Sequence, residues 1–209
     1  MVEKFRDWNE RYCSGDTPWD SGRPSRELER VLDEFSITPQ SVAGRAIDIG
    51  CGTGSDAIYL AERGFDVTGV DLAPKAIEKA QVNAENAGVE ASFRVADLLD
   101  YPNAEPFALV FDRGAYHCLR RVDLDAFLRT LQRITRPNSW YIALTGNAND
   151  PWDPPDGPPR VYAHELTAEL APLFDLVLLR EFLWDDIELR GQVRPVWGWV
   201  AVHRRKSTD

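Results

Sequence analysis

The sequence predicts an α/β fold with a doubly wound, mostly parallel sheet and helices on both faces, and three observations support this prediction. Short apolar stretches alternate with amphipathic ones between residues 45 and 145, at the spacing of β-α-β units. Gly50, Gly52 and Gly54 follow the first apolar stretch, where a strand would turn into a helix. The chain has 209 residues, which suffices for one compact domain but not for two. We therefore expect a single domain over residues 1–209.

Glycine and proline positions divide the alternating region into elements. Pro74 is placed to open a helix, and Gly64 and Gly88 are placed to end two helices. The expected strands cover residues 46–49, 66–71, 91–95, 107–112 and 139–145, and the expected helices cover 56–63, 74–88 and 123–135. Parallel strands at this rhythm require crossover helices on both faces of the sheet.

The two ends of the chain depart from this alternation. Residues 1–40 form an N-terminal cap segment, in which we expect an amphipathic helix within residues 1–13 and a second helix that begins near Pro24. Residues 147–160 contain a proline-rich run that excludes a helix or an internal strand, so we interpret them as a lid loop. A helix over 163–173 and two strands over 175–182 and 196–203 follow, and the last strand should be antiparallel.

The composition limits the partners. The formal net charge is −10, which repels phosphate backbones and anionic lipid, so we expect a small-molecule acceptor rather than nucleic acid or a membrane. The three cysteines show no metal-ligand spacing and no disulfide framework, so we expect no metal and a reducing compartment. The charged start of the chain and the lack of a long apolar run indicate a cytoplasmic protein, which we expect to be a monomer or a weak homodimer.

The glycine loop predicts a nucleotide-like ligand, because glycines let a ligand touch the backbone and the next helix offers unpaired N–H groups. Gly52, Gly54 and Ala57 also satisfy the dinucleotide pattern, so the glycines alone leave the nucleotide open. Asp48 before the loop would repel a pyrophosphate but can attract the ammonium group of a methionine moiety. Asp71 at the end of the second strand can accept hydrogen bonds from ribose hydroxyls, which suits both cofactors.

A third carboxylate favours S-adenosylmethionine over NAD. Asp97 follows the third strand, where it can accept from an adenine amino group while Leu98 packs on the ring. Three acids at the ends of three adjacent strands are difficult to explain by packing alone. The expected cofactor-binding set also includes Gly50, Cys51, Gly52, Leu72 and Asp112.

In this order, the runs Asp48–Gly54, Val67–Leu72 and Val95–Asp100 resemble the motifs of class I S-adenosylmethionine-dependent methyltransferases. The resemblance covers nearly the whole chain from residue 45 and implies a Rossmann-like, seven-stranded sheet with an antiparallel last strand.

The N-terminal segment narrows the resemblance. Trp8, Tyr12 and the run Thr17–Asp20 resemble the opening of the thiopurine, halide and thiol methyltransferase group, to which the tellurite-resistance methyltransferases are related. In these families this segment folds over the cofactor, which implies that Trp19 packs near it. The alternative for Trp19 is a core aromatic that anchors the N-terminal helices.

By the same resemblance, residues 111–119 pass beside the transferred methyl group. His117 can act as a general base or satisfy a structural hydrogen bond, and Tyr116 can hydrogen-bond or shape the acceptor pocket. Arg113 can bind an anionic acceptor or pair with an aspartate, and Arg160 can contact an acceptor carboxylate or remain solvated. Soft nucleophiles need orientation and desolvation more than a base, and the short chain leaves little room for the insertions of the thiopurine enzymes. We therefore expect a thiol, halide or metalloid acceptor.

Three other interpretations stay open. An NAD-linked oxidoreductase fits the glycines, but no tyrosine here has a lysine four residues later. A non-enzymatic module that binds S-adenosylmethionine would show the same acids. A protein or RNA methyltransferase of this fold is disfavoured by the acidic surface and by the run Asp112–Ala115, where enzymes acting on base or glutamine amino groups carry an Asn-Pro-Pro-Tyr-type tetrapeptide.

Overall fold

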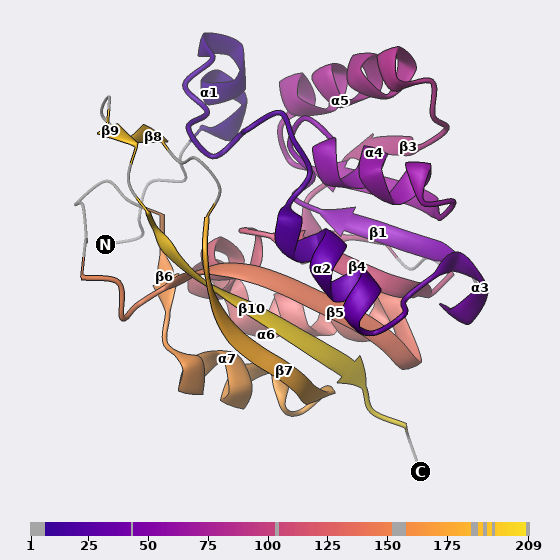
Figure 1. Cartoon of the computed structure of the whole chain (residues 1–209), viewed down its shortest axis with the longest axis vertical. Helices are drawn as coiled ribbons and strands as arrows, with labels where there is room; N and C mark the ends of the chain where they lie inside the picture. Colours follow the sequence, from indigo (N-terminus) through magenta and orange to yellow (C-terminus); the bar gives the residue numbers. More distant parts are fainter. Residues whose placement is uncertain are drawn as a thin grey trace.

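A mixed β-sheet forms the centre of the computed structural model, which describes residues 7–42, 44–102, 105–151, 158–184, 188–189, 192–193 and 195–207 (Figure 1). The strand order is β3-β2-β1-β4-β5-β10-β7, and β6 pairs with the end of β5. The strands are β1 (Arg45–Ile49), β2 (Asp66–Asp71), β3 (Ser92–Val95), β4 (Phe107–Arg113), β5 (Thr135–Asn147), β6 (Arg160–Val161), β7 (Phe174–Leu183) and β10 (Trp197–Arg205), with a separate hairpin of β8 (Glu188–Leu189) and β9 (Gln192–Val193). Within the described sheet, β10 alone runs opposite to the other strands, and it lies between β5 and β7. The predicted doubly wound sheet with an antiparallel last strand is confirmed.

Helices cover both faces of the sheet. The helices are α1 (Trp8–Ser14), α2 (Arg26–Glu34), α3 (Pro39–Val42), α4 (Ser55–Glu62), α5 (Pro74–Ala87), the 3-10 turn η1 (Leu98–Asp100), α6 (Tyr116–Ile134) and α7 (Ala163–Leu170). Apolar side chains of α2 and α4 form one core against the sheet, and those of α6 and α7 form a second core. The two pairs of helices lie on opposite faces of the sheet (Figure 1). None of the described helices combines the length and the apolar content that a membrane span requires.

Local sequence signals account for most helix boundaries. Ser25 caps α2, and its side chain accepts a hydrogen bond from the Glu27 amide, so Pro24 lies just before the helix rather than in its first turn. Pro74 stands at the start of α5, and Gly88 ends that helix in the left-handed conformation, as predicted. The expected helix within residues 1–13 corresponds to α1, although residues 1–6 lie outside the described residues.

The sequence prediction misplaced the start of α6. The helix begins at Tyr116, not near residue 123, and it is kinked at Asp123, which has the non-helical angles φ −157° and ψ 93°. The Asp123 carboxylate accepts a hydrogen bond from the Ala126 amide at 2.8 Å, so it caps the second half of the helix. The prediction therefore found a genuine helix start inside a longer helix. It also missed β6 and the β8–β9 hairpin, whose strands have only two residues each.

The topology brings the ends of four parallel strands to one edge of the sheet. The strands β1, β2, β3 and β4 are mutually parallel neighbours, so the loops after Ile49, Asp71, Val95 and Arg113 lie side by side. Helix α1 contacts α5 beyond this edge (Figure 1). A site at this edge is therefore built from the loops that the sequence marked and is covered by the N-terminal segment.

Candidate cofactor and acceptor site

The glycine loop after β1 needs its glycines. Gly50, Gly52 and Gly54 have positive φ angles of 69°, 54° and 85°, a region that favours glycine. A Cβ atom at Gly52 would lie 2.7 Å from the hydroxyl oxygen of Tyr12, which comes from α1. The loop therefore has both a constrained backbone and a close neighbour from the N-terminal segment.

Asp71 ties the end of β2 to this loop. Its carboxylate accepts hydrogen bonds from the backbone amides of Gly52 and Ala73, both at 2.9 Å. The residue is buried, and this burial raises the pKa of Asp71 while the amide donors oppose the rise. Its position at the carboxyl end of the strand is the one the sequence predicted.

Asp48 is a buried carboxylate without a complete set of partners. It is 2% exposed, and its Oδ2 atom has no hydrogen-bond partner among the described residues. Burial raises the pKa of Asp48 well above its ordinary value. The carboxylates of Asp56, Asp112 and Asp71 add to the rise, and the Arg113 guanidinium opposes it. An isolated buried carboxylate is costly unless a cation or donor pairs with it, so this arrangement suits a ligand that brings a positive charge.

Asp56, which the sequence analysis did not single out, joins three parts of the site. It lies in the first turn of α4 and is 3% exposed. One oxygen accepts from the Ser25 amide at 2.7 Å, and the other pairs with the Arg113 guanidinium at 2.9 Å. Arg113 also donates to the Arg23 carbonyl at 3.4 Å. Of the two roles left open for Arg113, the structure shows the pair with an aspartate.

The segment Trp19–Ser25, which we call the strap, is fixed at both ends. Asp20 accepts a hydrogen bond from the Thr53 hydroxyl of the glycine loop at 2.8 Å. Trp19 donates from its indole N–H to the Tyr12 hydroxyl at 3.2 Å, and the Arg11 guanidinium lies 4.2 Å from its ring centre. Because Tyr12 lies against Gly52, the aromatic cluster both anchors α1 and covers the glycine loop.

The loops after β2 and β3 carry the other residues predicted to bind the cofactor. Leu72 is 46% exposed directly after Asp71. Asp97 is exposed, and its side chain caps η1 by accepting from the Leu99 amide at 2.9 Å. Leu98 is buried in the core against α6, where Thr130 donates to its carbonyl. The structure thus places Asp97 and Leu98 at the expected edge, with Leu98 turned largely into the core.

Asp112 holds the loop after β4 in place through hydrogen bonds. It is fully buried and accepts from the amides of Ala115 and Tyr116 and from the Tyr141 hydroxyl at 2.8, 3.0 and 3.0 Å. Burial raises the pKa of Asp112 to about 7, although these hydrogen bonds oppose the rise. Both of its oxygens thus accept hydrogen bonds from the start of α6 and from Tyr141 of β5.

Tyr116 and His117 point to different places although they are adjacent in the chain. The Tyr116 hydroxyl donates to Glu169 of α7 at 2.6 Å, next to the Arg120 guanidinium, which also bonds Glu169. The His117 ring instead faces β5, where its Nδ1 accepts from the Gly146 amide at 3.1 Å. The structure therefore brings His117 to the end of β5 and Tyr116 to the interface between α6 and α7.

The predicted lid, residues 147–160, is described only in part. Residues 152–157 lie outside the described residues, and the remainder leads into β6, which pairs with β5 at Gly146. Arg160 donates to the Asp150 carbonyl at 3.0 Å. No group of three or more His, Cys, Asp or Glu side chains placed to hold a metal ion occurs in the described ranges.

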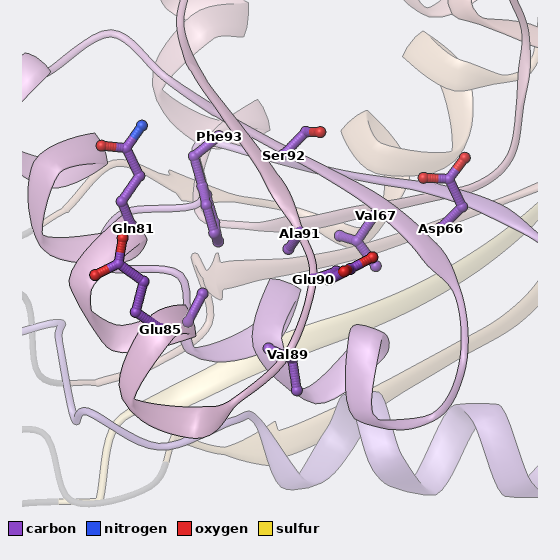
Figure 2. Close-up of a pocket in the computed structure, with 10 residues that line it drawn as sticks. Asp66, Val67, Gln81, Glu85, Val89, Glu90, Ala91, Ser92 and Phe93 are labelled. Carbon is purple, nitrogen blue, oxygen red and sulfur yellow. The ribbon is translucent and has the colours of Figure 1, made fainter.

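A pocket of about 350 Å³ opens at the other edge of the sheet, between the last turns of α5 and the beginnings of β2 and β3 (Figure 2). Its lining includes Asp66, Glu85 and Phe93. The Phe93 ring would lie 2.6 Å from a Cβ atom at Gly69 and 3.0 Å from one at Gly54. This ring therefore separates the pocket from the glycine loop, and the pocket is not part of the site described above.

The strand order, the glycine loop and the acids at the strand ends define a Rossmann-like domain that binds a nucleotide-type ligand at the carboxyl edge of its sheet. Comparisons with known proteins specify the class. Residues 46–138 match the family described as "Methyltransferase domain". The chain is 30% identical over 154 residues to the 2-heptyl-1-hydroxyquinolin-4(1H)-one methyltransferase of Mycobacteroides abscessus, over 69% of this chain and 66% of that protein.

The descriptions of two further matches, one relative and one solved structure, refer to sulfur compounds. The chain is 26% identical over 139 residues to the probable thiol methyltransferase 2 of Arabidopsis thaliana, over 66% of this chain and 60% of that protein. A solved structure described as "Conversion of a Disulfide Bond into a Thioacetal Group during Echinomycin Biosynthesis" superposes with a TM-score of 0.79 and 29% identity, over 97% of this chain and 92% of that chain. The chain spans slightly less than two thirds of the length of the two curated relatives. It belongs to the class I S-adenosylmethionine-dependent methyltransferases.

Proposed function

We propose that this protein transfers the methyl group of S-adenosylmethionine to a small nucleophile of the thiol, halide or metalloid type. S-adenosylmethionine is the cofactor, in line with the family and with structures of the same fold that hold its product, S-adenosylhomocysteine. One observation carries the choice of acceptor: in the described loop at residues 112–118, the two side chains suited to act as a base, Asp112 and His117, already accept hydrogen bonds from protein groups. Asp112 accepts three hydrogen bonds, and the Nδ1 lone pair of His117 is occupied by the Gly146 amide.

The cofactor roles follow from where the carboxylates lie. We assign the methionine ammonium to Asp48, whose Oδ2 atom is buried and unpartnered among the described residues. We assign the ribose hydroxyls to Asp71, which already holds the glycine loop in place. Asp97 is the acceptor for the adenine amino group, with Leu72 and Leu98 as apolar contacts for the adenosine. The close approach of Gly52 to Tyr12 supports a site that the N-terminal segment closes.

The reaction requires little acid–base chemistry from the protein. The nucleophile attacks the methyl carbon in line with the sulfonium, the carbon–sulfur bond breaks, and its electron pair neutralises the sulfonium to a thioether. A halide or a thiolate needs no base at this step, because a thiol loses its proton to solvent beforehand. What the protein supplies is alignment and exclusion of water, which are worth many kcal/mol in bimolecular reactions. The strap, with its hydrogen bonds to Thr53, Asp56 and Arg113, is suited to that task.

The relatives support a sulfur acceptor without specifying it. The thiol methyltransferase and the structure associated with thioacetal formation both involve sulfur by name, whereas the quinolinone methyltransferase acts on a heteroaromatic compound by its name. A small acceptor is also compatible with a site enclosed by the strap and the loop after β4.

The test is a panel of acceptors. The protein is incubated with S-adenosylmethionine and, separately, an alkyl thiol, iodide, tellurite and a small phenol, and S-adenosylhomocysteine and the methylated product are both quantified. We expect turnover with at least one of the first three acceptors and little with the phenol. Preferred methylation of the phenol would contradict the proposal. Tight cofactor binding without methylation of any acceptor would favour the non-enzymatic binding module, and tighter binding of NADH than of S-adenosylmethionine would favour the oxidoreductase.

A further inference from the structure

We propose that His117 binds the acceptor as a neutral hydrogen-bond donor through Nε2–H, so that the site selects acceptors that arrive as anions. This inference rests on the proposed function and deepens it, because it names the feature that recognises the nucleophile. It also replaces the general-base role that the sequence left open for this residue with a role in orientation.

The hydrogen bond from β5 fixes the tautomer of the ring. The Gly146 backbone amide donates to Nδ1 of His117 at 3.1 Å. A backbone amide nitrogen can only donate, so Nδ1 must be the unprotonated nitrogen. In the neutral imidazole the proton then lies on Nε2, which can donate but cannot accept.

The surroundings of the ring keep it neutral. His117 is 6% exposed, and burial lowers its pKa to about 4, with a smaller contribution from Arg121 one turn along α6. The acidic group of the adjacent loop, Asp112, is committed to the amides of Ala115 and Tyr116 and to Tyr141. At neutral pH the ring is therefore uncharged, and its only lone pair on nitrogen is occupied.

The Nε2–Cε1 edge of the ring lies next to the loop after β4. Cε1 and Nε2 of His117 would both lie 3.5 Å from a Cβ atom at Gly114, whose φ angle is +96°. Ala115, the next residue, would touch a Cβ atom at Gly50 at 3.0 Å. The ring edge therefore lies against the loop after β4, and that loop lies against the glycine loop. Within the described part of the chain, the hydrogen bond of the His117 ring is made through Nδ1.

An N–H group at this place recognises an anion. A thiolate or a halide can accept the hydrogen bond while its reactive lone pair points at the methyl group, and hydrogen bonds that involve a charged partner are the stronger kind. A neutral alcohol gains less from such a donor and finds no base in the described part of this loop. The donor thus distinguishes nucleophiles by charge rather than by size.

Two substitutions of His117 distinguish a hydrogen-bond donor from a general base. His117→Leu removes both nitrogens, whereas His117→Gln retains an N–H donor and an oxygen that can accept from Gly146. As a matched control, His164→Leu makes the same change at an exposed histidine at the start of α7. Each variant is assayed for kcat and KM with iodide and with an alkyl thiol, and cofactor affinity is measured separately to show that the site is folded.

A donor role predicts the same pattern for both acceptors. We expect kcat/KM to fall about 10- to 100-fold in His117→Leu, mainly through KM, since a hydrogen bond to a charged group is lost. His117→Gln should recover most of this loss, and His164→Leu should behave as the wild type. At saturating S-adenosylmethionine, methylation of iodide should show the same pH profile between 5.5 and 8 in the wild type and in His117→Gln, and methylation of the thiol should in addition follow the ionisation of the thiol. A base would give another result: both His117 variants would lose thiol methylation, and neither would affect iodide.

A measurement independent of activity tests the tautomer. The chain has three histidines, so the His117 signals in ring-nitrogen NMR spectra can be assigned by comparison with His117→Gln. We expect an unprotonated Nδ1 and a protonated Nε2 at pH 7 in the cofactor-bound wild type. A cationic ring, or a proton on Nδ1, would overturn the inference even if the protein methylates thiols. If the tautomer is as expected and the wild type methylates none of the small nucleophiles, the proposed function fails and the donor assignment fails with it.

Discussion

Replacing Asp48 by asparagine tests whether the ammonium group of the cofactor binds at this buried carboxylate. The substitution preserves the shape of the side chain but removes its charge. Asp48 lies 2% exposed at the end of β1, with an unpartnered Oδ2 atom and three neighbouring carboxylates. If the ammonium group of the cofactor binds there, the variant should lose a charge-assisted contact and little else.

The magnitude follows from the kind of interaction that is lost. A hydrogen bond to a charged group contributes about 1.5–3 kcal/mol, and each 1.4 kcal/mol corresponds to a tenfold change in affinity. The dissociation constant of S-adenosylmethionine should therefore rise about 10- to 100-fold in Asp48→Asn. Without cofactor the variant should be at least as stable as the wild type, since it lacks a buried carboxylate among three others.

The pH dependence of binding has a definite sign. Burial raises the pKa of Asp48 in the free protein, and an ammonium group beside it would lower that pKa. Binding should therefore release a proton, so the affinity of the wild type should increase with pH and that of Asp48→Asn should increase less. Isothermal titration calorimetry in two buffers of different ionisation enthalpy measures both the affinity and the proton release.

The control is the Asp→Asn substitution at Asp66, the first residue of β2, at the edge of the sheet away from the site. Its carboxylate is exposed, and its Oδ2 atom lies 3.5 Å from Nε of Arg45. Asp66→Asn should bind the cofactor as the wild type does. If Asp48→Asn also binds with unchanged affinity and the same proton release, the ammonium does not lie at Asp48, and the assignment of the cofactor in this site is refuted.

Three further outcomes are expected. Burial raises the pKa of Asp112 to about 7 in the folded protein, above that of an unfolded aspartate, so the native state holds a proton at this group that the unfolded state lacks, until the pH rises through 7. In denaturant titrations of the cofactor-free protein, the free energy of unfolding of the wild type relative to Asp112→Asn should therefore fall between pH 5 and 8, and a flat or rising difference would contradict this. Asp56→Ala should release the strap, because it removes the hydrogen-bond acceptor for the Ser25 amide. Limited proteolysis should then cleave the strap faster than in the wild type, and equal rates would show that other contacts hold the strap. Gly52→Ala should destabilise the protein by about 1 kcal/mol or more and weaken cofactor binding, because the added Cβ atom would lie 2.7 Å from the Tyr12 hydroxyl oxygen at a backbone φ angle of +54°. An unchanged melting temperature would contradict this expectation.

The fold was predictable because its boundaries are marked locally. Glycines with positive φ angles end α4 and α5, and Pro74 opens α5, so the chain signals these turns without reference to distant residues. The start of α6 was not predictable in the same way. Asp123 has the features of an ordinary helix cap, and only the packing of Tyr116 and His117 in tertiary structure shows that the helix begins seven residues earlier.

The site was predictable where its residues stand at strand ends. Asp48 and Asp71 follow directly from the alternation of strands and helices, which places them beside the glycine loop. Asp56 escaped detection because its partners, Ser25 and Arg113, lie 31 and 57 residues away in the chain. A carboxylate in the first turn of a helix is common for its interaction with the helix dipole, so no local signal distinguishes one that fixes the strap.

Arg113 links the buried carboxylates of the site to the strap. It is paired with Asp56, it is the cation that opposes the raised pKa of Asp48, and it donates to the strap carbonyl at Arg23. One cation thus acts on two buried carboxylates. An ammonium group at Asp48 would supply the second positive charge, so that Arg113 is committed to Asp56 and the strap. Under the proposed assignment of the ammonium group to Asp48, cofactor binding and ordering of the strap would favour each other by linkage.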